Sequence, residues 1–356
     1  MRLFALTSLV FCALAHPTPA AEYPRPTEGD YVIPNFRFTN GQTLPEVRMH
    51  YRSLGTPRRD ASGIVRNAVL IMHGTGGSGS TFIRDEFAGE LFGKDQPLDA
   101  ERYYIIIPDD LGHGKSSKPS DGLRMTFPSY VYADMIVAEH RLLVEGLKVD
   151  HLRLAMGTSM GGMHTWLWGE RYPTMMDALL PLASLPEQIS GRNRVWRRML
   201  ADSIRSDAQW KNGDYTTQPN GLRQAAYMLY FMSENPAQRY QQAPTGAQAD
   251  KAMDAYAANI LRTYDANDLL YAIESSRDYD PAPALESIQA PLLAINFADD
   301  LINPPDLGIL ERQIKRVPHA KALLIPESAQ THGHGTHTLA AVWREHLMEL
   351  LKETEK

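Results

Sequence analysis

The chain has 356 residues, of which 43% are hydrophobic and 22% charged, and its formal net charge is −6. This length allows a sizeable core, and the composition is ordinary for a globular protein. The negative charge and the lack of lysine or arginine runs argue against a nucleic acid or an anionic membrane surface as a partner.

Residues 1–21 are predicted to be a secretory signal peptide. A single Arg2 precedes an apolar stretch over residues 3–15, and small residues surround Ala20, where cleavage is expected. The apolar stretch is too short to span a membrane, so we expect no stable anchor after cleavage. Cys12 is the single cysteine and lies in this segment, which excludes disulfides and thiol catalysis in the mature chain. We therefore predict an exported, periplasmic protein.

Two segments with alternating polarity, 31–38 and 46–55, come first in the mature chain and predict half-exposed antiparallel strands. Continuous apolar runs follow, and these are typical of strands buried on both faces of a parallel sheet. They cover residues 68–74, 103–110, 151–157, 178–184, 291–300 and 321–328. Helical patterns at 130–147 and 161–173 separate some of these runs, and this alternation predicts a doubly wound, mostly parallel α/β sheet.

The segment 190–285 breaks this alternation, because it contains helix-like stretches rich in Met, Tyr and Trp but no strand-like run. We predict an inserted helical lid above the carboxyl ends of the strands, where ligands bind in such sheets. The core domain would then comprise residues 22–189 and 286–356. The lid helices are candidates for pairing two subunits into a homodimer.

Residues 157–162, GTSMGG, place Ser159 among glycines, after an apolar run and before a helical pattern. This is the context of a nucleophile elbow, a sharp turn from strand to helix that strains the serine backbone. Glycines flank such a serine because a Cβ would collide there. The alternative is a flexible Gly/Ser loop. We predict that Ser159 is a nucleophile.

A serine nucleophile needs a histidine base oriented by a carboxylate. In proteins with a nucleophile elbow, the acid and then the histidine follow the serine along the chain. A late apolar run ends in Asp299 and Asp300, either of which could be the acid. The segment after the last run supplies His332, His334 and His337 as candidates for the base. The required residue types therefore occur in the required order.

An oxyanion hole needs two N–H groups that face the developing negative charge. We expect one from Met160, at the start of a helix, and one from Thr75 or Gly76 in the glycine-rich loop 73–80. This loop lacks the lysine of a phosphate-binding loop, so no cofactor is predicted. His73 is expected to brace the loop. The remaining histidines outside the late segment are expected to be structural or at the surface: His50, His113, His140, His151, His164 and His319.

The late histidines also form the pattern H-x-H-x-x-H, which favours a metal site as a rival hypothesis. The pattern lacks an aspartate within the cluster and has no evident ligands upstream. We therefore predict a serine-based site without a metal.

Several segments carry a resemblance to a known family. Residues 157–173 are similar to an elbow and helix of the type G-G-S-M-G-G, and 206–215 and 263–273 are similar to two segments of a helical lid. Together they resemble the α/β-hydrolase superfamily and, within it, homoserine O-acetyltransferase and its exported hydrolase-like relatives. The resemblance implies an α/β-hydrolase fold. Alignment on Pro304 and on the family's Gly-His-Asp motif selects Asp300 and His334.

The sequence also departs from the transferases. Their arginine clamp for an amino-acid carboxylate corresponds to Ala201, although Arg197 and Arg198 lie nearby. Residues 108–119 resemble the loop of general hydrolases rather than that of the transferases. The resemblance therefore implies the catalytic residues but neither homoserine nor acetyl-coenzyme A.

These observations predict an exported serine hydrolase that cleaves small acyl esters through Ser159, Asp300 and His334. An acyltransferase that uses an alcohol or amine in place of water is the alternative. A third hypothesis is a catalytically dead binding protein with the same pocket. The Met, Tyr and Trp residues of the lid favour a mainly apolar pocket for neutral esters.

Overall fold

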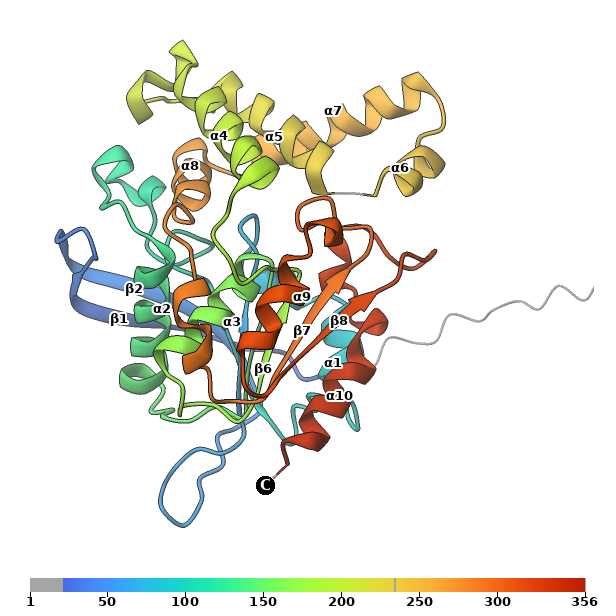
Figure 1. The fold of residues 1–356 in the computed structure, drawn as a ribbon. Helices are drawn as coiled ribbons and strands as arrows, with labels where there is room; N and C mark the ends of the chain where they lie inside the picture. The colour runs from blue at the N-terminus through green and yellow to red at the C-terminus, as the bar shows by residue number, and fades with distance from the viewer. Residues whose placement is uncertain (1–21, 234, 356) are drawn as a thin grey trace, which may run out of the picture.

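The structure, a computed structural model, describes residues 22–233 and 235–355. The predicted signal peptide lies outside the described residues. Eight strands form one sheet in the order β1-β2-β4-β3-β5-β6-β7-β8 (Figure 1). Their bounds are β1 Thr27–Arg37, β2 Thr43–Leu54, β3 Ala68–Met72, β4 Tyr104–Pro108, β5 Leu154–Thr158, β6 Leu179–Leu182, β7 Leu292–Phe297 and β8 Ala320–Ile325.

The sheet is mixed at one end and parallel elsewhere. Strand β2 pairs antiparallel with both β1 and β4, whereas the other neighbours pair parallel. The alternating segments thus became the antiparallel pair and the continuous apolar runs became the parallel strands. The predicted mostly parallel α/β sheet is confirmed.

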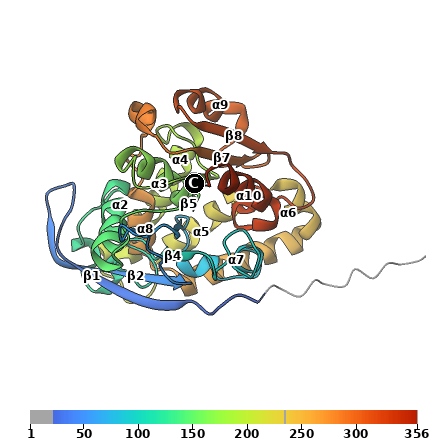
Figure 2. The same ribbon diagram turned by 90° about the horizontal axis from the view of Figure 1, so that it is seen from below.

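Helices cover both faces of this sheet. Along β3, Val69 and Ile71 pack with residues of α1 and α10, whereas Leu70 and Met72 pack with residues of α2 and α3. Figure 2 accordingly shows α2 and α3 on one side of the strands and α10 on the other. These helices span α1 Ala88–Leu91, α2 Tyr132–Arg141, α3 Met160–Arg171 and α10 Arg344–Glu353. Each of the four β3 side chains is 0% exposed, and burial of such a side chain stabilises the fold by about 1.5–3 kcal/mol.

Strand β8 differs from the expectation of burial on both faces. Leu324 is 42% exposed, and Lys321 is also exposed. The physical reason is position, because β8 is the last strand of the sheet and pairs on one side with β7 alone.

In the described part of the chain, five α-helices lie between β6 and β7, above the carboxyl ends of the parallel strands (Figure 1). They span α4 Gly191–Arg205, α5 Asn220–Ser233, α6 Pro236–Gln242, α7 Gly246–Thr263 and α8 Ala266–Glu274. Residues such as Trp196, Trp210 and Met232 pack into a hydrophobic cluster of their own. The short helix α9, Ile309–Gln313, follows β7. Among the described residues, no helix is long and apolar enough to cross a bilayer.

Candidate active site

Ser159 lies at the sharp turn between β5 and α3. Its φ of 56° and ψ of −110° are strained for a residue with a side chain. A Cβ at Gly157 would lie 2.2 Å from the Gly161 carbonyl oxygen, and a Cβ at Gly161 would lie 2.0 Å from that of Met72. Neither position can therefore hold another residue without a shift of the backbone. The glycines of GTSMGG thus allow the strand and the helix to approach each other closely. The alternative of a flexible Gly/Ser loop is wrong.

The ring of His334 bridges Ser159 and Asp300. Its Nε2 lies 2.8 Å from Ser159 Oγ, and its Nδ1 lies 2.7 Å from Asp300 Oδ2. Because a carboxylate only accepts hydrogen bonds, Nδ1 carries the proton and Nε2 is free to accept the serine proton. The three residues come from the ends of β5 and β7 and from the segment after β8.

The Asp300 carboxylate is itself held in place. It is 1% exposed, and Oδ1 accepts hydrogen bonds from the backbone N–H groups of Ile302 and Asn303 at 2.7 and 3.1 Å. Burial alone would raise the pKa of Asp300, but the charge of His334 and these hydrogen bonds outweigh it and lower the pKa below its usual value. Asp300 is therefore ionised and oriented at neutral pH.

The neighbouring aspartate makes different contacts. Asp299 Oδ2 accepts hydrogen bonds from the Gly333 N–H at 2.8 Å and from the Asn235 side-chain amide at 2.8 Å. Asp299 thus holds the backbone next to His334 and one residue of the α6 N-terminus, but it does not contact the ring. Of the two candidates, the structure brings Asp300 to the histidine.

The other late histidines do not join His334 around a common point. His332 is exposed, and the His337 ring packs edge to face on the His334 ring with centroids 5.0 Å apart. Burial and the charge of His334 lower the pKa of His337 to about 3. Among the described residues, this segment does not bring three ligand atoms together as the rival metal hypothesis requires.

The two candidate oxyanion donors lie near Ser159. Met160 is the first residue of α3, whose initial N–H groups have no acceptor within the helix. Thr75 follows Gly74, and a Cβ at Gly74 would lie 3.4 Å from Ser159 Cβ. The glycine-rich loop thus passes directly against the nucleophile. These positions suit N–H groups that face a substrate carbonyl.

Two histidines support the carbonyl groups of this loop. His73 donates from Nδ1 to the Gly74 oxygen at 2.8 Å and accepts the Asp110 N–H on Nε2 at 3.0 Å, so it braces the loop as expected. His113 Nε2 lies 3.1 Å from the Thr75 oxygen. The sequence predicts only that His113 is structural or at the surface, and does not indicate this contact with the loop. Its place in the glycine-containing segment 112–114, after β4, is the signal that could have found it.

A cavity of about 520 Å³ lies between the glycine-rich loop and helices α7 and α8. The lining side chains are mainly polar and do not include Ser159 or His334, whereas Trp196, Trp210 and Met232 pack within the lid. The Tyr264 hydroxyl, at the end of α7, donates a hydrogen bond to the Gly76 carbonyl. The polar side chains of the lining include Ser78, Ser80, Thr81, Arg84, His113, Lys118, Asn259, Thr263, Asp265 and Asp268.

The arginines near the expected carboxylate clamp point in different directions. Ala201 is buried in the hydrophobic cluster of the lid. Arg198 points outward and forms an ion pair with Asp202 at 2.6 Å. Arg197 precedes Ala201 by four residues, so it lies on the same face of α4 and is 3% exposed. That spacing is the signal by which the sequence could have selected Arg197 over Arg198.

The buried guanidinium of Arg197 lies where the lid meets the core. It donates to Asn193 Oδ1 at 2.9 Å and to Ser276 Oγ at 3.1 Å, and the Tyr132 phenol is close by. Among the described residues, no carboxylate pairs with Arg197. A cation buried without a counter-ion is costly, and here the guanidinium carbon lies 5.0 Å from the centre of the Trp196 ring.

Comparisons with known proteins show the family of this chain. Residues 67–330 match the family described as alpha/beta hydrolase fold. The chain is 28% identical over 295 residues to a probable acyltransferase of Methanothermobacter thermautotrophicus, covering 83% of this chain and 89% of that one. It is also 28% identical over 298 residues to homoserine O-acetyltransferase of Trichormus variabilis, covering 76% and 79% of the two chains. An acetylester hydrolase from Corynebacterium glutamicum superposes with a TM-score of 0.79 at 19% identity, covering 92% and 96%.

Proposed function

This chain belongs to the alpha/beta hydrolase fold family, and we propose that it transfers the acyl group of an ester to Ser159 and from there to an acceptor. The contact of Ser159 Oγ with His334 Nε2 at 2.8 Å carries the proposal, because it joins a strained, partly exposed hydroxyl to a base oriented by Asp300. Water is the first acceptor to consider, which makes the enzyme a carboxylic-ester hydrolase.

The steps follow from this geometry. Ser159 Oγ attacks the ester carbonyl while His334 Nε2 takes its proton, and the N–H groups of Met160 and Thr75 stabilise the oxyanion. Collapse of the tetrahedral intermediate expels the alcohol, which receives the proton from His334. Water then attacks the acyl-enzyme with His334 as base again, which releases the acid and restores the hydroxyl of Ser159.

A second candidate function replaces water by an alcohol or amine that bears a carboxylate. The position of Arg197 favours this acceptor, because its buried guanidinium has no carboxylate partner among the described residues. The names of the two sequence relatives at 28% identity also favour acyl transfer over hydrolysis. Both functions share the acyl-enzyme on Ser159 and differ in what removes the acyl group.

One experiment separates the two functions. The mature protein, from residue 22 on, is incubated with p-nitrophenyl acetate, with and without homoserine, and the free acid and the transferred product are quantified. Free acid as the main product in both reactions supports the hydrolase. A dominant acetylated product, reduced more than hydrolysis by Arg197→Met, supports transfer to a carboxylate-bearing acceptor. Failure of wild type and Ser159→Ala alike to release nitrophenol faster than buffer contradicts the proposal.

We also propose that the enzyme is exported to the periplasm and that it acts there on a small acyl ester. The arrangement of Arg2, the apolar stretch and the small residues near Ala20 supports export. Expression in a Gram-negative host followed by fractionation tests this. Recovery of the uncleaved chain in the cytoplasm would contradict it.

A further inference from the structure

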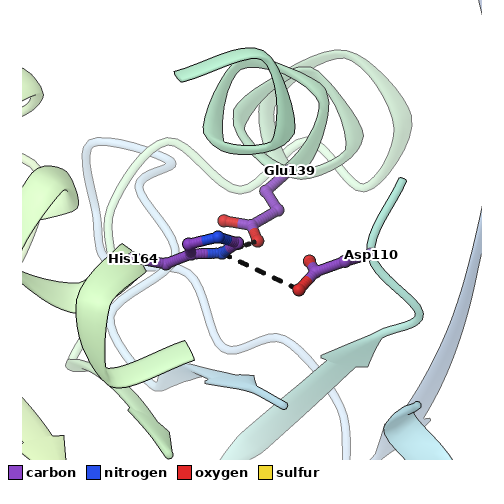
Figure 3. Close-up of side chains that lie close together, drawn as sticks. All are labelled: Asp110, Glu139 and His164. Carbon is purple, nitrogen blue, oxygen red and sulfur yellow. Dashed lines mark hydrogen bonds and ion pairs between the residues drawn. The ribbon is translucent and has the colours of Figure 1, made fainter. Parts of the chain in front are cut away.

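Three ionisable side chains from different elements lie close together (Figure 3). Asp110 follows β4, Glu139 lies on α2 and His164 lies on α3, and each is 0% exposed. His164 Nδ1 is 3.1 Å from Glu139 Oε1 and 3.7 Å from Asp110 Oδ2. The reaction proposed above does not use this cluster.

The hydrogen-bond donors available to the two carboxyl groups are too few for both to be ionised. Glu139 accepts the Trp168 indole N–H at 2.6 Å and lies within hydrogen-bond distance of the one N–H that His164 Nδ1 can offer. His73 Nε2 already accepts the backbone N–H of Asp110, so it cannot donate to the Asp110 carboxyl. Within the described part of the chain, neither Asp110 oxygen accepts a hydrogen bond from another residue. An ionised Asp110 would thus be a buried charge without a hydrogen bond, since the nearest ring nitrogens, His73 Nε2 and His164 Nδ1, both lie 3.7 Å from Oδ2, and this is strongly unfavourable.

We infer that Asp110 is a neutral carboxylic acid that donates its proton to Glu139, and that this pair positions the oxyanion loop of the enzyme proposed above. Burial and the charge of Glu139 raise the pKa of the Asp110 carboxyl well above its usual value. Burial also raises the pKa of Glu139, whereas the hydrogen bond from Asp110 counteracts this. A carboxyl oxygen of Asp110 and one of Glu139 lie within 4.8 Å of each other, so the pair can share one proton across the space between β4 and α2.

The connection to the loop runs through the backbone of Asp110. With its carboxyl group fixed against Glu139, Asp110 directs its N–H to His73 Nε2 at 3.0 Å. His73 in turn donates to the Gly74 oxygen, and its own carbonyl accepts the N–H of Gly161 at 2.9 Å. Asp110 is thus a positioning residue, which acts on Thr75 through His73 and Gly74. Protonation also keeps a negative charge away from the place where the oxyanion develops.

Two variants separate these roles. Asp110→Asn keeps a donor for Glu139, so kcat should stay within about threefold of wild type. Asp110→Ala removes that donor, so the loop should shift and kcat should fall by up to about a hundredfold with little change in KM. If kcat stays the same in both folded variants, or falls equally in both, the positioning role is refuted.

Infrared difference spectroscopy tests the proton independently of activity. The wild-type spectrum at neutral pH should contain the C=O stretch of a protonated carboxyl group, and Asp110→Asn should lack that intensity. Glu170→Gln serves as the control, because burial and the charge of Asp280 raise the pKa of Glu170 to about 8 and it adds a similar band. An unchanged band in Asp110→Asn overturns the inference, as does a stoichiometric metal ion in purified protein that is lost in this variant. Since the spectrum needs no substrate, an inactive wild type would refute the proposed function without deciding this inference.

Discussion

Replacement of Asp300 by asparagine is the most direct test of the proposed mechanism. Oδ1 of Asp300 accepts two backbone N–H groups, at 2.7 and 3.1 Å, whereas Oδ2 faces His334 Nδ1 at 2.7 Å. The asparagine oxygen would keep the two backbone donors, and its NH2 group would then face Nδ1. His334 would respond by moving its proton to Nε2, the atom that must accept the proton of Ser159.

The expected cost follows from that change of tautomer. The corresponding substitution in a serine protease lowers kcat about ten-thousand-fold, which is about 5 kcal/mol in the activation barrier. A similar loss is expected here, because His334 bridges the same two kinds of group. The Asn303 side-chain amide, 3.2 Å from Oδ2, would also face the new NH2 group, which adds a small cost in stability.

The assay is steady-state hydrolysis of p-nitrophenyl acetate, with melting temperatures to show that each variant is folded. Asp299→Asn is the matched control, because this neighbour contacts Gly333 and Asn235 but not the His334 ring. Asp299→Asn should lower kcat much less than Asp300→Asn does. The assignment of Asp300 would be refuted if Asp300→Asn lowered kcat less than tenfold, or if Asp299→Asn lowered kcat more than Asp300→Asn does.

Three further predictions concern the serine and the histidines. Ser159→Ala should lower kcat by about a million-fold while the variant melts close to wild type, and retained ester hydrolysis would remove Ser159 from the mechanism. His334→Ala should be nearly as damaging in the same assay, and His332→Ala and His337→Ala should be milder; an essential His332 would show that the late segment is misassigned. Burial lowers the pKa of His113 to about 4, so between about pH 6.5 and 4 the unfolded chain binds more protons than the folded one. His113 alone should therefore take about 3 kcal/mol from the free energy of unfolding as the pH falls through this range, and urea unfolding of His113→Gln should show a weaker pH dependence.

The sheet, and the order of serine, aspartate and histidine along the chain, could be predicted from the sequence. Runs such as AVLIM, residues 68–72, are apolar at every position because both faces of a parallel strand are covered. Because the carboxyl ends of parallel strands meet at one edge, side chains after different strands come together there. Ser159 and Asp300 could be brought near one another on this ground, whereas the choice of Asp300 over Asp299 depended on the resemblance at Pro304.

Other features depend on which way side chains point in the folded protein, and the order of residues along the chain does not determine this. The cluster of Asp110, Glu139 and His164 unites residues 25 to 54 positions apart on three elements, and nothing in their spacing indicates contact. The lid shows a second limit. Its aromatic and Met residues could line a ligand pocket or pack on one another, and composition is the same in both cases. In the structure, most of these lid residues pack on one another, and mainly polar side chains line the cavity.

The contacts between the lid and the core have a consequence for engineering. The Tyr264 hydroxyl donates a hydrogen bond to the Gly76 carbonyl, and the Asn235 amide donates one to Asp299. Asp299 also accepts the N–H of Gly333, beside His334. A chimera that receives the lid of a relative to change its substrate range would lose both attachments unless the donor supplies equivalent side chains. Such a graft should therefore slow turnover of every ester alike, and restoring Asn235 and Tyr264 in the transplanted helices should recover it.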